Sequence, residues 1–277
     1  MKRINFVDIL LITVCLFSCN LTEKKRDQTI LPVTSDLQKD TISSFNDEEC
    51  DSEEEPVIDK KMYLDIVTEH LKIKQDDYIV EFSDVQILPD KNKSIVLITE
   101  YASDEKNTDG DFSIYMRLFI LDNNSKKVIG QLKEVILLES SALKITGLSL
   151  NLTSYQLLPD FIDFSVEISR ETMGRGSPYT EKSAYLFIFM NDEIINILDN
   201  YSTYSHSTYW AREDSVVNTE IYTHLAKSAE LTNLFPDIIA ISDSTFENVL
   251  FDVDKDQVIT RKNRGKNILK FQNGKYQ

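Results

Sequence analysis

The chain has 277 residues, of which 46 are acidic and 30 basic, and its formal net charge is −16 at pH 7. Such a charge disfavours nucleic acids and anionic lipid surfaces as partners, because like charges repel and basic side chains are needed to displace counterions from phosphates. Divalent cations or a basic protein partner remain compatible with it.

The first nineteen residues combine a basic start, a short apolar stretch and a cysteine. Lys2 and Arg3 precede the apolar stretch Ile9–Phe17, which is followed by Ser18 and Cys19. A transmembrane helix needs about 20 apolar residues, so this stretch is too short to span a bilayer. The ending Leu-Phe-Ser-Cys resembles the lipobox of a bacterial lipoprotein signal peptide.

The resemblance implies both a cellular location and a lipid anchor. Residues 1–18 would be removed, and Cys19 would carry a diacylglyceryl thioether and an N-acyl chain; two or more chains give stable anchoring. Removal of Lys2, Arg3 and Asp8 changes the charge from −16 to −17. Asn20 replaces the aspartate that resembles an inner-membrane retention signal, so we expect a lipid-anchored protein of the cell envelope, at the outer membrane.

Residues 19–56 are expected to form a disordered acidic tether. They contain four basic and eleven acidic side chains, a net of −7, and few residues able to form a core. Cys15 falls in the signal peptide and Cys19 is the lipidation site, so Cys50 is left without a disulfide partner. Its acidic neighbours disfavour the thiolate, which argues against a reactive role.

Residues 57–277 are predicted to form one mostly β domain that begins with a helix. Ile58, Met62, Ile66 and His70 recur every four residues, and Asp59 is a suitable N-cap. We expect His70 at the edge of the helix's apolar face.

Strands are predicted where β-branched and aromatic residues concentrate. Residues 213–235 fit both a helix and a strand, and Thr219, Ile221 and Thr223 favour the strand. The Asn273-Gly274 pair predicts a tight hairpin. The other predicted strands are Tyr78–Leu88, Ser94–Tyr101, Phe112–Leu121, Val128–Leu138, Leu143–Leu150, Phe161–Ile168 and Ala184–Met190.

The expected fold class is mainly β, an antiparallel sandwich or bent sheet with one N-terminal helix. Three similar strand-and-turn units, beginning at Leu118, Leu186 and Ile268, raise the alternative of a partial β-propeller. Their separations of about 70 and 80 residues exceed the usual blade period. Ser165–Leu198 and the ending Ile268–Tyr276 resemble predicted secreted bacterial proteins of unknown function, which implies a style of fold and no activity.

Three alternating aspartates form a candidate calcium site. Asp252, Asp254 and Asp256 match positions 1, 3 and 5 of a calcium-binding loop. Gln257 stands where such a loop needs glycine, and Asn263 stands where it needs a bidentate glutamate. An exposed acidic hairpin turn is therefore favoured over weak calcium binding.

A second candidate site lies among the aromatic and hydroxyl residues 201–210. Tyr204, Tyr209 and Trp210 could stack on a sugar or anchor a protein interface. The alternative is an alternating strand whose tyrosines cover the edge of a sheet.

Catalytic signatures are scarce in this sequence. It contains neither a Gly-x-Ser-x-Gly nor a His-Glu-x-x-His motif. Ser205 and His206 do not form a dyad, since neighbouring residues of a strand point to opposite faces. We expect a binding or interaction protein without a cofactor. Its alternatives are a carbohydrate-active hydrolase with an aromatic platform, an immunity-type inhibitor of a basic toxin, and a structural spacer.

Overall fold

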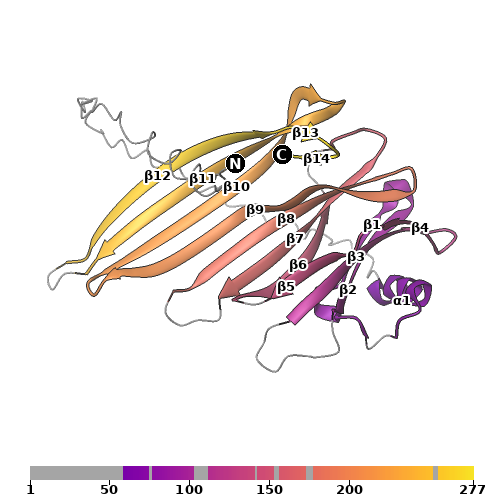
Figure 1. The fold of residues 1–277 in the computed structure, drawn as a ribbon, viewed down its shortest axis with the longest axis horizontal. Coiled ribbons are helices and arrows are strands. Elements are labelled where there is room, and N and C mark those ends of the chain that lie inside the picture. Colours follow the sequence, from indigo (N-terminus) through magenta and orange to yellow (C-terminus); the bar gives the residue numbers. More distant parts are fainter. Residues whose placement is uncertain are drawn as a thin grey trace, which may run out of the picture. The chain divides into compact units, whose positions relative to one another are not determined.

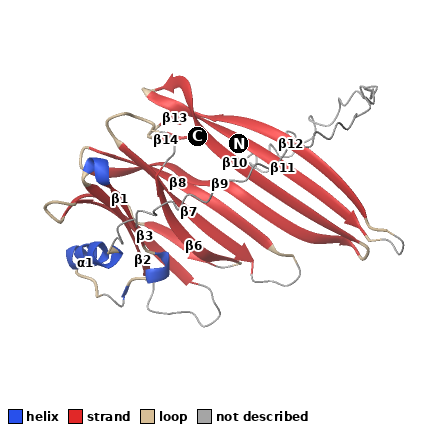
Figure 2. Cartoon of the chain, turned by 180° about the vertical axis from the view of Figure 1, so that it is seen from behind, coloured by secondary structure: helices blue, strands red, loops and turns tan. Residues whose placement is uncertain are grey.

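The computed structural model describes residues 59–74, 77–102, 112–140, 142–152, 156–172, 177–251 and 255–277. All of them belong to one compact unit, Glu55–Gln277. Residues 1–58 lie outside the described residues, and with them the predicted lipobox, Cys19 and the acidic tether. The structure is mainly β with one α-helix near the start of the described residues (Figures 1 and 2).

Helix α1 (Lys60–Leu71) confirms the predicted N-terminal helix. Asp59 caps it, because its Oδ1 accepts a hydrogen bond from the Met62 backbone N–H at 3.4 Å. The helix ends at Lys72, which adopts a left-handed conformation with φ of 59°. Tyr63, Leu64 and Val67 are buried and form part of one apolar cluster with residues of the first three strands. Among the described residues, no helix is both long and apolar enough to cross a membrane.

Most of the strands belong to a single twelve-stranded sheet. Its main path runs β1-β2-β3-β4-β9-β10-β11-β12, with β5 paired to β3 and with β6, β7 and β8 joined in succession to β9. The strands are β1 (Asp84–Leu88), β2 (Lys93–Tyr101), β3 (Phe112–Asp122), β4 (Lys127–Leu132), β5 (Ile136–Ser140), β6 (Leu143–Leu152), β7 (Ile162–Thr172), β8 (Tyr179–Met190), β9 (Glu193–Arg212), β10 (Ser215–Thr232), β11 (Phe235–Leu250) and β12 (Gln257–Leu269).

Neighbouring strands of this sheet are antiparallel, except for a short parallel contact between β4 and β9. That contact joins Gln131 to Glu193 and Leu132 to Ile194. A separate two-stranded hairpin, β13 (Phe271–Gln272) and β14 (Lys275–Tyr276), turns at Asn273-Gly274 with φ of 52° and 85°, which confirms the predicted tight turn.

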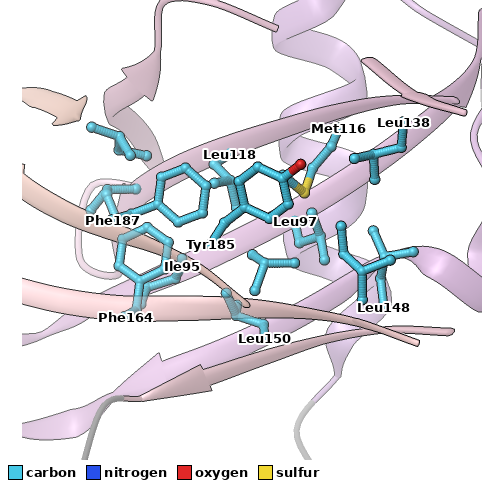
Figure 3. Packing of buried hydrophobic residues seen from close by; sticks show 14 of the residues in the cluster. Ile95, Leu97, Met116, Leu118, Leu138, Leu148, Leu150, Phe164, Tyr185 and Phe187 are labelled. Atoms are coloured by element: carbon cyan, nitrogen blue, oxygen red, sulfur yellow. The ribbon is translucent and has the colours of Figure 1, made fainter. Parts of the chain in front are cut away.

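Two apolar cores lie on opposite faces of β8. Tyr185, Phe187 and Phe189 belong to the first core, in which Phe187 stacks on Phe164 with ring centroids 5.4 Å apart. Figure 3 shows this core, to which β2, β3 and β5 contribute residues together with β6, β7 and β8. The residues labelled in the figure are Ile95, Leu97, Met116, Leu118, Leu138, Leu148, Leu150, Phe164, Tyr185 and Phe187. Leu186 and Ile188 point the other way, into the second core with Leu225 and Ile238. The sheet therefore bends so that one strand is buried on both faces.

The mainly β prediction with one helix is confirmed, and the bent sheet is the form it takes. The alternative of a partial β-propeller is not confirmed, since β1 to β12 form one continuous sheet instead of separate blades.

Two strands are longer than predicted, since β7 continues to Thr172 and β8 begins at Tyr179. Two other predicted strands were wrong in more than length. Only Asp84–Leu88 of the segment Tyr78–Leu88 is a strand, because Val80–Phe82 forms a 3-10 turn closed by a hydrogen bond from Ser83 Oγ to the Ile79 carbonyl. The segment Val128–Leu138 splits into β4 and β5, which pair with different ends of β3. The break allows β4 to reach β9, where Lys133 forms an ion pair with Glu193.

Candidate binding surface on strands β9 to β12

The outer parts of β9 to β12 form a sheet that contacts solvent on both faces. Trp210, Tyr222 and Val258 are 60, 55 and 58% exposed on one face, and Tyr209 and Ile259 are 43 and 47% exposed on the other. Towards the inner ends of the same strands, residues such as Leu225, Ile238 and Ala240 are buried in the second core. The sheet thus continues beyond the core that supports it (Figure 1).

The register of the strands assigns each side chain to a face. Directly paired residues of an antiparallel sheet point to the same side, and successive residues of a strand alternate. Tyr204 pairs with Tyr222, and Trp210 pairs with Val216. We call the side that carries them the tyrosine face. Tyr209 pairs with Val217 and lies on the reverse face.

Tyr204 and Tyr222 form the inner part of the tyrosine face. Their ring centroids are 4.8 Å apart, and both hydroxyls donate hydrogen bonds to Glu220 Oε1, at 3.3 Å from Tyr204 and 2.9 Å from Tyr222. The hydrogen bond to Glu220, followed by burial and the negative charge of Glu220, raises the pKa of Tyr222 to about 12. Burial and then the charge of Glu220 raise the pKa of Tyr204 as well.

A depression of about 380 Å³ lies next to this tyrosine pair. Glu220 lines it together with His206, Thr208, Asn218, Thr245 and Glu247. His206 pairs with Glu220 and Thr208 pairs with Asn218, so these residues share the tyrosine face. The Thr208 hydroxyl donates to Asn218 Oδ1 at 2.9 Å. The depression therefore presents imidazole, hydroxyl, amide and carboxylate groups from one face of three neighbouring strands.

An apolar platform lies at the outer end of the tyrosine face. The rings of Trp210 and Phe251 are 5.9 Å apart. Val216 pairs with both Trp210 and Val249, and Val249 pairs with Val258, so the three valines form a row beside the tryptophan. Trp210 is separated from Tyr204 by six residues of β9, which is about 20 Å at the rise of an extended strand.

The structure brings together two of the three aromatic residues singled out in the sequence. Tyr204 and Trp210 share the tyrosine face, whereas Tyr209 lies behind it, so the three do not form one platform. β9 is an interior strand as far as Ser207, paired with β8 on one side and β10 on the other, so Tyr204 does not lie at an edge. Beyond Ser207, the part that carries Tyr209 and Trp210 pairs with β10 alone among the described strands. Sequence reasoning missed Glu220 and Tyr222, because only the register of β10 places them beside Tyr204.

The histidines lie apart from one another. His206 and Ser205 point to opposite faces, as the alternation predicted, since they pair with Glu220 and Ile221 respectively. His70 is on α1 with its ring 6.1 Å from that of Phe119 in an edge contact, at the border of the apolar cluster as expected. His224 lines a different depression, beside Leu225 and Thr223.

The candidate calcium loop is only partly within the described residues. Asp252 and Asp254 lie outside them, while Asp256 is exposed immediately before β12. The strand ending at Leu250 and the strand beginning at Gln257 flank the loop, as the sequence indicated. Within the described part of the chain, there is no group of three or more His, Cys, Asp or Glu residues that could hold a metal ion.

Comparison of this chain with protein-family models, with curated proteins and with solved structures found no match.

Proposed function

We propose that this protein is a lipid-anchored binding protein of the bacterial cell envelope and that the tyrosine face of β9 to β12 holds its ligand. The lipobox-like sequence ending at Cys19 supports the anchor. The depression between the tyrosine pair and the Trp210 platform supports the binding role, and it is the observation that carries the proposal.

The ligand class that fits this face is a glycan without negative charge. Sugar rings offer apolar C–H faces for stacking on aromatic side chains and hydroxyls for hydrogen bonds. Tyr222 and Trp210 supply exposed aromatic surfaces, and Thr208 and Asn218 supply donors and acceptors between them. Glu220 and Glu247 would repel a carboxylated or phosphorylated sugar and favour a neutral or amine-bearing one.

Calorimetric titration of the full-length protein with neutral, amine-bearing and acidic envelope glycans tests this ligand class. We expect binding of neutral or amine-bearing chains, and a loss of about tenfold or more in affinity for Tyr222→Ala and for Trp210→Ala. Tyr209→Ala is the matched control, because it removes an exposed aromatic residue from the reverse face. Equal losses for Tyr209→Ala and Trp210→Ala would contradict a site on the tyrosine face.

The anchor has a separate test. Cys19→Ala should move the protein from the membrane fraction to the soluble fraction, whereas Cys50→Ala should leave it in the membrane. Retention of Cys19→Ala in the membrane pellet would reject the anchor and leave the binding proposal standing.

A carbohydrate hydrolase is the second candidate, and the two glutamates favour it. Glu220 pairs with Thr245, two residues from Glu247, so the two glutamates are diagonal neighbours on adjacent strands. The Cα atoms of such neighbours are about 7–8 Å apart, a spacing from which two carboxylates can reach the separation of about 5–9.5 Å found in glycosidases. Two observations favour binding instead: Glu220 already accepts two tyrosine hydroxyls, and all six lining residues lie on one open face. Release of reducing sugar that is abolished by Glu247→Gln would favour the hydrolase.

A further inference from the structure

Positive charge is concentrated at the end of this acidic chain. Residues 257–277 contain six basic side chains and no acidic one, although the whole chain has 46 acidic residues. The six are Arg261, Lys262, Arg264, Lys266, Lys270 and Lys275. Four of them lie on β12, which is exposed from Gln257 to Ile268. The last strand of the sheet is therefore a cationic element in an anionic protein.

β12 is also an edge strand of unusual regularity. It pairs with β11 on one side, and no described strand pairs with its other side. Its register with β11 runs without a break through thirteen pairs, from Ile238 with Leu269 to Leu250 with Gln257. In an antiparallel pair, every second residue directs its N–H and C=O away from the neighbouring strand. The outer edge of β12 thus presents a long, regular row of backbone donors and acceptors.

Proteins usually protect such an edge by making it short, by a bulge, by proline or by charge. β12 has thirteen residues, an unbroken register and no proline, so charge is the protection it has. The positive charge opposes pairing with a second copy of β12 but not pairing with an acidic strand. In antiparallel pairing of two copies centred on Arg264, Lys262 would face Lys266 and Arg264 would face its counterpart. Like charges directly opposite are destabilising, whereas opposite charges are stabilising.

The cations that matter most lie on one face of β12. Lys262, Arg264 and Lys266 are at alternate positions and share the tyrosine face through their pairing with Thr245, Asp243 and Ile241. Successive members are about 7 Å apart along the strand. Arg264 contacts Asp243 at 3.5 Å, and its side chain is still 70% exposed. An incoming strand with acidic residues at every second position would match this spacing.

We propose that the outer edge of β12 binds an extended acidic segment of a partner protein as an added antiparallel strand. Backbone hydrogen bonds to the edge would supply affinity, and pairing of alternate Asp or Glu residues with Lys262, Arg264 and Lys266 would select the partner. None of the six residues that line the depression belongs to β12, although Val258 of β12 lies in the valine row beside Trp210. Glycan titration and peptide titration therefore test the two proposals separately.

The test uses the full-length protein and three synthetic peptides as long as β12: one that alternates valine with glutamate, one that alternates valine with glutamine, and one that alternates proline with glutamate. We expect the valine–glutamate peptide to bind about tenfold or more tightly than the other two. Binding should weaken as ionic strength rises. Arg264→Glu/Lys266→Glu should reduce the affinity by a similar factor.

The matched control is Lys61→Glu/Lys74→Glu, which makes the same charge change on and just after α1 and should leave the affinity within about twofold. Melting curves of both double variants establish that they fold. Should the glutamate variant fail to fold, Arg264→Gln/Lys266→Gln replaces it with the same expected direction.

Amide hydrogen exchange separates strand addition from simple charge attraction. We expect the valine–glutamate peptide to slow exchange at alternate residues of Gln257–Leu269 by about tenfold or more, because added strand pairing protects outward-directed amides. Equal binding of the proline–glutamate peptide, or binding without amide protection, would overturn the proposal. So would binding of anionic phospholipid vesicles in the absence of any peptide binding, since the edge would then recognise a lipid surface.

Discussion

Tyr204 and Tyr222 face each other directly across β9 and β10, and their hydroxyls share a single acceptor, Glu220 Oε1. Since Tyr222 is 55% exposed, the arrangement fixes the orientation of an aromatic ring that solvent or a ligand can reach. A hydrogen-bonded tyrosine pair of this kind loses less side-chain freedom on binding than a free tyrosine would. This preorganisation is the physical reason for placing the binding site on the tyrosine face.

The ionisation of Tyr222 should depend on Glu220. Its pKa is raised from 10.0 to about 12, so the folded state favours the neutral phenol. The resulting contribution to stability is fully present below pH 10 and disappears as the pH rises through about 12. In Glu220→Gln the acceptor loses its negative charge, and we expect Tyr222 to titrate closer to its ordinary value. Phenolate absorbance between pH 9 and 13 measures the change. Glu247→Gln is the control; an identical shift in both variants would contradict the assignment.

Gly130 on β4 should not tolerate a side chain. A Cβ added there would lie 2.9 Å from Cδ2 of Phe189 and closer still to Cε2, and Phe189 is held in the first core. We expect Gly130→Ala to reduce the free energy of unfolding by about 1–3 kcal/mol. Gly147→Ala is the matched control, because the nearest atom to its added Cβ is 4.0 Å away. Urea unfolding of both variants measures the difference in the free energy of unfolding. Equal values for Gly130→Ala and Gly147→Ala would contradict the prediction and mean that the Phe189 ring can move away from the added Cβ.

Leu234 should be better replaced by glycine. It forms the turn between β10 and β11 with Asn233, at φ of 71°, and its side chain is 84% exposed. A left-handed conformation costs a non-glycine residue about 1–2 kcal/mol, partly offset in the variant by the greater freedom of unfolded glycine. We therefore expect Leu234→Gly to raise the melting temperature. Asn233→Gly should not, since asparagine tolerates this conformation and its Nδ2 donates to the Phe271 carbonyl at 2.8 Å. A lower melting temperature for Leu234→Gly would show that the leucine stabilises the turn.

The aromatic residues of the tyrosine face should contribute little to folding. Trp210→Ala is expected to change the free energy of unfolding by about 0.5–1 kcal/mol, because Trp210 is 60% exposed. Phe187→Ala, which removes a fully buried ring stacked on Phe164, should cost about 3–5 kcal/mol. Chemical denaturation of both variants measures the difference. A comparable cost for Trp210→Ala would assign the tryptophan to the fold instead of to a ligand.

Calcium at millimolar concentration should change the melting temperature little. A loop with aspartate at alternate positions lacks the closing glutamate that calcium sites of this type require. Thermal unfolding with calcium and with a chelator tests this, with Asp256→Ala and Asp254→Ala as variants. A shift of many degrees that disappears in Asp254→Ala would establish a calcium site.

Local sequence determined the features that depend on neighbouring residues alone. The four-residue period and the Asp59 cap specified α1, and Asn273-Gly274 specified its hairpin, because helix caps and tight turns are satisfied within a few residues. Strand alternation predicted opposite faces for Ser205 and His206, but the prediction grouped Tyr209 with Trp210, which the register places on opposite faces. The lipobox-like start is a further local signal, and it stands as a prediction.

Only the tertiary structure decided which residues meet. Asp84–Leu88 is a strand because it pairs with β2, while Val80–Phe82 is a turn. Val128–Leu138 divides into β4 and β5, which pair with different ends of β3, and β4 also pairs with β9, so these tertiary contacts override local β-propensity. The register of β10 brings Glu220 and Tyr222 to Tyr204, and the strand order leaves β12 at an edge. Strand register is set by contacts between segments far apart in the chain, so the sequence supplied the aromatic and basic side chains, and the fold supplied their arrangement.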